Sequence, residues 1–191
     1  MNIFKQAFEN SIKTKQKCLQ QGFTNLETMG KAISVSIKAG GKLMICGNGG
    51  SAADAQHLVA ELLIRLRPKV DRAPLAAMTL AQDTSTITAC ANDYSFDQLF
   101  ARNLKAFARS GDCLLGISTS GNSENVRRAL EEAKTLNVKS FSFLGAGGGV
   151  CLGVSELSFV VPSDDTASIQ EAHIVAGHAL MQYVEEKVCG V

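Results

Sequence analysis

From Lys42 onward, short apolar runs bounded by Gly and Ser alternate with segments of helical periodicity, and this alternation restricts the chain to few folds. It is typical of β-α-β units, in which successive strands lie parallel in one sheet and helices pack on its faces. The sequence therefore predicts a doubly wound α/β fold with a five-stranded, mostly parallel sheet flanked by helices. The strands are expected at residues 43–46, 75–80, 113–117, 140–144 and 157–161.

Helices are expected between most of these strands and at both ends of the chain. The segments with helical periodicity are residues 51–66, 84–91, 96–108, 123–136 and 168–188. Two amphipathic helices precede the first strand, with apolar stripes from Phe4 to Leu19 and from Leu26 to Ile37. They carry more apolar surface than one α/β layer needs, which predicts a homo-oligomer. Without a repeat or a linker, residues 1–191 are expected to form one domain.

Charge and hydropathy exclude several classes of partner. The 19 basic and 18 acidic residues give a net charge of +1, which leaves no surplus to attract nucleic acid or an anionic membrane. No run of about 18 apolar residues could span a bilayer, and the first twenty residues lack the apolar stretch of a secretion signal. Six scattered cysteines without metal-binding spacing are typical of reduced thiols. We expect a cytoplasmic protein that binds neither nucleic acid nor membranes.

Two strand-to-helix turns are unusual, and such turns form the ligand sites of open α/β sheets. The first, residues 46–53, reads Cys-Gly-Asn-Gly-Gly-Ser-Ala-Ala, where glycines let the backbone approach a ligand and the next helix offers free N–H groups. It partly matches the GxGxxA fingerprint of dinucleotide-binding proteins. The acidic residue expected about 20 residues further on is missing, so a nicotinamide-dependent enzyme is the least favoured interpretation.

The second turn, residues 116–123, reads Gly-Ile-Ser-Thr-Ser-Gly-Asn-Ser and leads into a helix. An ordinary helix N-cap needs a single hydroxyl or amide. Four hydroxyls and an amide exceed that need, and hydroxyl donors together with helix N–H groups can saturate a phosphate dianion without a lysine. The excess of donors favours a phosphate-binding turn over a simple cap.

All three histidines lie in two helical segments that also carry carboxylates or amides. His57 and Glu61 are four residues apart, so their side chains share one helix face. Near the chain end, Gln170, His173 and His178 stand in an otherwise apolar helix. Imidazole and carboxylate are ligands that zinc accepts. On these residues alone, a metal site and a set of buried structural side chains both remain open.

Helix geometry limits which of these residues can meet. On an ideal helix, Gln170 and His178 lie about 80° apart around the axis and about 12 Å apart along it. Both reach one ion only if they lean together or the first turn is distorted. His173 lies about 140° from His178 around the axis, so only one of these two histidines is expected to face a site shared with His57.

These motifs together resemble the phosphoheptose isomerases, a family of sugar isomerase (SIS) domain proteins. The resemblance covers essentially the whole chain and is most specific at residues 46–51, 57–61, 92–93, 116–123 and 169–178. It implies an aldose–ketose isomerase that interconverts sedoheptulose 7-phosphate and D-glycero-D-manno-heptose 7-phosphate through an enediolate, for the heptose of bacterial surface glycans such as the lipopolysaccharide core. It further implies a homotetramer with sites at subunit boundaries and one Zn²⁺ per subunit.

The resemblance also assigns roles to residues of this chain. Glu61 and His178 would be catalytic, with Glu61 moving the carbon-bound proton and His178 the oxygen-bound protons. Zinc would be held by His57, Glu61, Gln170 and His178 and would polarise the carbonyl group. The substrate would contact Asn48, Ser51, Arg65, Asp93, Ser118, Thr119, Ser120, Ser123 and Gln170.

One position departs from the family pattern, and one alternative function remains. Ala167 stands where members of the family often carry Asp, three residues before the glutamine, so the step that this Asp assists has no assigned residue here.

The main alternative is a non-catalytic SIS-domain protein that binds a phosphosugar or a protein such as a replication initiator, since fold does not fix function. The set of His57, Glu61 and His178 favours the enzyme, because a binding module has no use for it.

Overall fold

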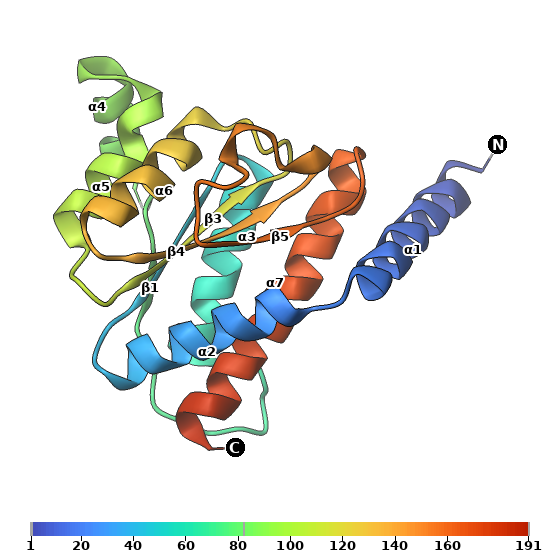
Figure 1. The fold of residues 1–191 in the computed structure, drawn as a ribbon, viewed down its shortest axis with the longest axis horizontal. Coiled ribbons are helices and arrows are strands. Elements are labelled where there is room, and N and C mark those ends of the chain that lie inside the picture. The colour runs from blue at the N-terminus through green and yellow to red at the C-terminus, as the bar shows by residue number, and fades with distance from the viewer. Residues whose placement is uncertain (1, 82, 191) are drawn as a thin grey trace.

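The computed structural model describes residues 2–81 and 83–190, which form a sheet covered by helices on both faces (Figure 1). The five strands are β1 (Leu43–Gly47), β2 (Ala77–Thr79), β3 (Cys113–Ser118), β4 (Lys139–Leu144) and β5 (Leu157–Val160). They lie in the order β2-β1-β3-β4-β5, and every neighbouring pair is parallel. The predicted doubly wound α/β fold is confirmed, and the sheet is wholly rather than mostly parallel.

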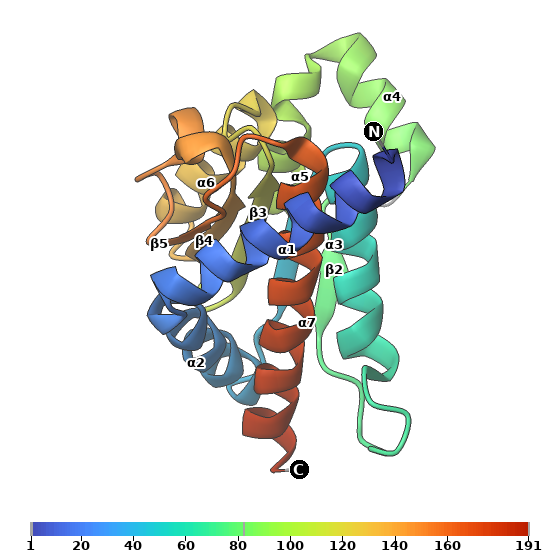
Figure 2. The ribbon, with the colours of Figure 1, turned by 90° about the vertical axis from the view of Figure 1, so that its right-hand side faces the viewer.

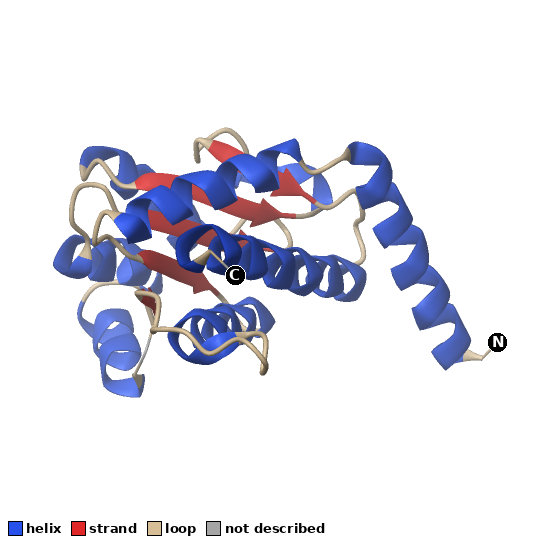
Figure 3. Ribbon diagram, turned by 90° about the horizontal axis from the view of Figure 1, so that it is seen from below, coloured by secondary structure: helices blue, strands red, loops and turns tan. Residues whose placement is uncertain are grey.

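Alternating side chains along each strand feed two separate cores. Leu43 and Ile45 of β1 face one core, whereas Met44 and Cys46 face the other. This is the period-two alternation of a strand that is buried on both sides. The first core packs α2 (Thr24–Lys38), α3 (Gly50–Ala60) and α7 (Thr166–Cys189) against the sheet, and the second packs α4 (Thr84–Asp93), α5 (Leu99–Phe107) and α6 (Glu124–Thr135). Figure 3 shows the strands enclosed between these helices.

Three predicted elements differ in detail from those observed. The strand expected at residues 75–80 is ordered as β2 over only three residues, because it lies at the edge of the sheet and pairs with β1 alone. The helix expected at residues 96–108 begins as the 3₁₀ helix η2 (Phe96–Gln98) before α5. The helix expected at residues 51–66 changes at its end from α3 to the π-helix η1 (Glu61–Arg65). A short 3₁₀ segment, η3 (Ala146–Cys151), follows β4.

The first helix, α1 (Ile3–Gln21), projects from the body of the molecule (Figures 1 and 3). Its middle crosses α7, where Glu171 accepts hydrogen bonds from Ser11 and from Lys15. Figure 2 shows this crossing. Large apolar side chains along α1 are exposed to solvent: Ile3, Phe4, Phe8, Ile12 and Leu19.

The order of the strands brings two turns together. β1 and β3 are neighbours, and the helices that follow them, α3 and α6, pack on opposite faces of the sheet. In open parallel sheets a crevice forms at the carboxyl ends of two such strands. The two unusual turns of the sequence therefore lie side by side at the place where α/β proteins bind ligands. Among the described residues, no helix is long and apolar enough to cross a membrane.

Candidate functional site

The turn between β3 and α6 presents hydroxyl groups at a helix start. Ser118 ends β3 and is buried, Thr119 is half-buried and Ser120 is exposed. The Oγ atoms of Ser118 and Ser123 lie 2.9 Å apart, and Ser120 Oγ accepts the Asn122 N–H at 3.1 Å. Ser123 occupies the N-cap position of α6, but its side chain makes no capping hydrogen bond. Val126 N–H donates instead to Asn125 Oδ1, so among the described residues the N–H groups of Glu124 and Asn125 have no side-chain partner of the kind that a simple cap would give.

The segment after β4 is hydrogen-bonded to this turn. Cys151 N–H donates to the carbonyl of Gly121 at 2.9 Å, and Val150 N–H donates to Asn122 Oδ1 at 3.1 Å. The first turn of α6 also carries an acid, Glu124, which would repel an anion. Hydrogen bonds from Arg127 and then Arg128 compensate its charge and lower its pKa to about 2. The turn is therefore held in place and suited to bind a phosphate group.

The turn between β1 and α3 packs closely against α7 and α6. A Cβ atom at Gly50 would lie 2.0 Å from Gln170 Nε2, so only glycine admits this amide at the first turn of α3. Asn48 exchanges two hydrogen bonds with Asn125 of α6, at 2.8 and 2.9 Å. Ser51 is only 4% exposed, so a ligand would have to enter the turn to reach it.

Close packing of α3 on α7 brings three titratable side chains into one cluster. A Cβ atom at Gly177 would lie 2.7 Å from the side chain of Leu58, and these two residues adjoin His178 and His57 in the sequence. His57 Nε2 lies 2.7 Å from His178 Nε2 and 3.3 Å from Glu61 Oε1. The two rings meet edge to face, with centroids 5.0 Å apart. Because two N–H groups cannot point at each other, one Nε2 atom donates its N–H and the other accepts it with the lone pair that could otherwise bind a metal.

The helix changes geometry at this cluster. α3 ends at Ala60, and Glu61 begins the five-residue π-helix η1. Isolated π-helical turns occur frequently at functional sites, where they change the direction of a side chain. This turn could not be predicted from the sequence, since Leu62, Leu63 and Ile64 are as compatible with an α-helix as with a π-helix.

Asp54 lies beside the cluster and was not predicted from the sequence. It lies one turn before His57 on α3, and its Oδ2 atom is buried without a hydrogen-bond partner among the described residues. Burial raises the pKa of Asp54, while the charges of His57 and His178 act in the opposite direction. Its spacing of three residues from His57 was the available signal.

His173 takes no part in the cluster, as its helical position predicted. It is 1% exposed, and its Nε2 lies 3.0 Å from the carbonyl oxygen of Leu144 at the end of β4. The carbonyl can only accept, so Nε2 carries the proton, and Nδ1 is left buried without a partner. Burial lowers the pKa of His173 to about 4. His173 is a neutral structural residue that ties α7 to the sheet.

The cluster fits a zinc ion in its chemistry and dimensions. The ligand atoms of His57, Glu61 and His178 all lie within 4.8 Å of one another. Ligand atoms in a tetrahedral zinc site are about 3.3 Å apart, given bonds of about 2.0–2.1 Å. The pair His57–Glu61 already has this separation, and the two imidazole nitrogens need to move apart by about 0.6 Å. The unpaired Asp54 oxygen adds negative charge, which also favours a cation.

Three of the predicted site residues lie apart from the cluster. Gln170 rests against Gly50, about two helical turns before His57 on α3. Arg65 at the end of η1 and Asp93 at the end of α4 are exposed, and neither bonds to the cluster within the described part of the chain. Their proposed roles stay predictions.

Comparisons with known proteins agree with this geometry. The sequence profile of the SIS domain family matches residues 7–145, so the class defined by the fold and the paired turns is the SIS-domain protein. The phosphoheptose isomerase of Pelodictyon phaeoclathratiforme is 45% identical over 176 residues, covering 92% of this chain and 83% of that protein. The phosphoheptose isomerase of Aquifex aeolicus is 43% identical over 185 residues, covering 97% of this chain and 96% of that protein.

A solved structure leads to the same family. The structure of a phosphoheptose isomerase from Francisella tularensis has a TM-score of 0.90 and 36% sequence identity, and the match covers 96% of each chain. The chain belongs to the phosphoheptose isomerase family and is an isomerase.

Proposed function

We propose that this isomerase interconverts sedoheptulose 7-phosphate and D-glycero-D-manno-heptose 7-phosphate through an enediolate, and that it supplies heptose for bacterial surface glycans. One observation supports the proposal: the cluster of His57, Glu61 and His178 lies on α3, η1 and α7, and the turn before α3 is hydrogen-bonded to α6, whose first turn follows the hydroxyl-rich residues 118–123. The phosphate group would bind at Ser118, Thr119, Ser120 and Ser123 and at the free N–H groups of α6. This grip places the other end of the sugar toward α3 and supplies binding energy for its orientation.

Isomerisation requires the transfer of a proton between adjacent carbons and of protons between their oxygens. Glu61 is the base that takes the proton from one carbon and returns it to the next, since a carboxylate both accepts and releases a proton at one place. His178 transfers the oxygen-bound protons, because imidazole donates and accepts near neutral pH. Asn48 and Ser51 contact the sugar from the turn between β1 and α3, and Arg65 and Asp93 complete the site.

The ligands for a zinc ion would be His57, Glu61, His178 and Gln170, the last after its side chain has turned from Gly50 toward His57. When bound, zinc would supply Lewis-acid polarisation of the carbonyl and stabilise negative charge on oxygen. The buried Asp54 carboxylate adds to the negative charge that would hold it.

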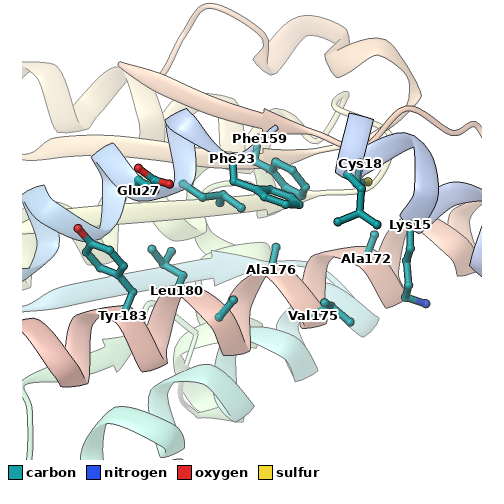
Figure 4. Close-up of a pocket in the computed structure, with 13 residues that line it drawn as sticks. Lys15, Cys18, Phe23, Glu27, Phe159, Ala172, Val175, Ala176, Leu180 and Tyr183 are labelled. Atoms are coloured by element: carbon teal, nitrogen blue, oxygen red, sulfur yellow. The ribbon is translucent and has the colours of Figure 1, made fainter. Parts of the chain in front are cut away.

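We also propose a homotetramer with sites at the subunit boundaries. A groove of about 510 Å³ lies between α1, α2 and α7 and is lined almost entirely by apolar side chains, among them Phe23, Phe159 and Leu180 (Figure 4). Phe8 and Ile12 on the projecting α1 are 71% and 55% exposed. A second copy of the chain supplies an apolar helix of this kind, and the same contact would bring exposed residues such as Arg65 and Asp93 to a neighbouring site.

The free cysteines fit a cytoplasmic location, which we propose as well. All six cysteines are free thiols, and five of them are buried. Burial raises the pKa of Cys46 and of Cys113, which keeps both groups protonated and unreactive. Cys18, Cys90 and Cys151 are buried too, as is usual for cysteines that serve as small apolar residues in a reducing compartment.

The direct test is to incubate the purified protein with sedoheptulose 7-phosphate and to follow the appearance of the aldose by NMR. We expect turnover that is lost on treatment with a chelator and restored by Zn²⁺. Binding of the sugar phosphate without any aldose product would contradict the proposal and support the non-catalytic phosphosugar-binding alternative.

A further inference from the structure

Two amide side chains join the two turns of the site. Asn48 Nδ2 donates to Asn125 Oδ1 at 2.8 Å, and Asn125 Nδ2 donates to Asn48 Oδ1 at 2.9 Å. Asn48 lies directly before the start of α3, whereas Asn125 lies in the first turn of α6. Asn125 is 2% exposed, so water does not compete for its hydrogen bonds. The pair is therefore a fixed link between the helix that carries His57 and the helix that begins at the phosphate-binding turn.

The backbone decides which way both amides face. Val126 N–H donates to Asn125 Oδ1 at 2.9 Å, so a flipped Asn125 would set an amino group against this N–H. With Asn125 held in one orientation, Asn48 must turn its amino group to Asn125 Oδ1 and its oxygen to Asn125 Nδ2. An amide has two N–H groups, so one N–H of Asn48 remains for a ligand in a known direction.

We propose that Asn125 is a positioning residue of the isomerase. It acts through Asn48, whose remaining N–H it directs at the sugar, and it sets the distance between the phosphate grip and the cluster of Glu61 and His178. The inference rests on the proposed function, in which Asn48 and the turn after β3 contact the substrate. Reacting groups held by remote binding tolerate little displacement, and an error of about 1 Å costs up to about 10²-fold in rate.

A double-mutant cycle tests this role. Asn125→Ala should lower kcat about tenfold or more while KM changes less than about threefold, because the phosphate grip remains. Asn48→Ala should cause a similar loss. If Asn125 acts through Asn48, the kcat of the double variant should be no more than about threefold below that of the less active single variant. The reason is that the effects of two residues that act as one unit do not add. The proposal would be overturned if the loss in kcat of the double variant equalled the product of the two single losses. It would also be overturned by a kcat of Asn125→Ala within about twofold of the wild type.

Two further variants separate positioning from stability. Ser142 is buried on β4 with its hydroxyl 2.8 Å from those of Ser155 and Ser158, and it bonds to neither Asn48 nor Asn125. Ser142→Ala should lower the melting temperature and leave kcat and KM unchanged. If Asn125→Ala does not fold, Asn125→Asp replaces it. It keeps the oxygen for Val126, sets a carboxylate oxygen against Asn48 Oδ1 in place of the donor, and adds a negative charge. Its kcat should still fall, and an unchanged kcat would count against the proposal.

The cycle also distinguishes this inference from the proposed function. If the wild type does not convert sedoheptulose 7-phosphate, the proposed function is wrong, and the same four proteins are compared by denaturant unfolding. The effects of Asn48→Ala and Asn125→Ala on the unfolding midpoint should then be non-additive, as expected for contacting side chains. Additive effects would show that the amide pair does not form and would overturn the inference.

Discussion

Glu61 is the residue on which the proposed chemistry depends most. Glu61→Gln keeps the size of the side chain but removes the proton acceptor, so kcat should fall by about 10² to 10⁴. KM should change little, because the phosphate turn is intact. The same substitution removes a ligand from the cluster, so the purified variant should also retain less zinc, as measured by elemental analysis. Glu9→Gln is a matched control, since Glu9 is exposed on α1 and, within residues 2–81 and 83–190, its ion pair is with Lys5 alone.

The outcome separates two functions. Near-normal turnover by Glu61→Gln would exclude the proton transfer proposed here. If the cluster instead serves only to hold metal, added zinc should restore the activity of Glu61→Gln in full. His173→Ala should leave zinc retention nearly unchanged, because His173 faces β4 rather than the cluster.

His173 predicts a dependence of stability on pH. Its pKa falls from 6.5 to about 4 in the folded chain because it is buried. Between these values the unfolded chain binds the proton more tightly than the folded chain. The free energy of unfolding is therefore highest above about pH 6.5 and falls as the pH drops toward about 4. The loss should amount to about 3 kcal/mol, given about 1.4 kcal/mol per pKa unit. Denaturant midpoints measured from pH 7 to pH 4 test this expectation.

His173→Gln provides the comparison, because it retains an N–H donor for Leu144 but does not titrate. Its unfolding free energy should vary less with pH than that of the wild type across this range. Parallel curves for the two proteins would show that another group causes the acid sensitivity.

At this scale, spacing along the sequence predicted some contacts and missed others. The four-residue spacing of His57 and Glu61 and the angular position of His173 were sufficient, because both follow from the geometry of a single helix. The burial of Asp54 and the contacts of Asn125 depend on packing between elements. No local pattern distinguishes Asn125 from an ordinary first-turn residue of a helix, so its pairing with Asn48 could only be seen in the structure.

Among the elements, the turn between β3 and α6 offers the most direct test. A phosphosugar at 100 times its dissociation constant should stabilise the protein by about 2.7 kcal/mol through mass action. Ser120→Ala combined with Ser123→Ala removes two hydroxyl donors, so most of the ligand-induced rise in melting temperature should disappear. Thr135→Ala, at the other end of α6, should keep the full rise. An unchanged ligand-induced rise in the double variant would show that the phosphate binds elsewhere.

The elements themselves were largely readable from the sequence. Strands buried on both faces, such as β1 and β3, are continuous apolar runs, and all five strand positions were found. The length of β2 and the presence of the π-helix η1 could not be predicted from the sequence, for two different reasons. An edge strand ends where its single neighbour stops pairing with it. A π-helical turn is stabilised by contacts of the folded molecule rather than by the propensities of its own residues.

At the scale of the whole molecule, the exposed apolar side chains of α1 lead to a prediction of the oligomeric state. In a single chain, Phe8 and Ile12 lie exposed on a helix whose buried residues, Ser11, Thr14 and Cys18, begin near its middle. Apolar surface of this kind usually marks an interface. We expect light scattering at micromolar concentration to give about four times the chain mass of 20.2 kDa. A monomer under these conditions would contradict the proposed tetramer.

Substitutions on α1 connect assembly with activity. Phe8→Asp combined with Ile12→Asp should dissociate the oligomer with little effect on the fold of each subunit, because neither side chain is buried within the chain. Phe107→Asp, at an exposed position at the end of α5, is the matched control and should leave the mass unchanged. If Arg65 and Asp93 complete the site of a neighbour, the dissociated variant should lose most of its kcat while still binding zinc. Full activity in a dissociated variant would show that each subunit contains a complete site.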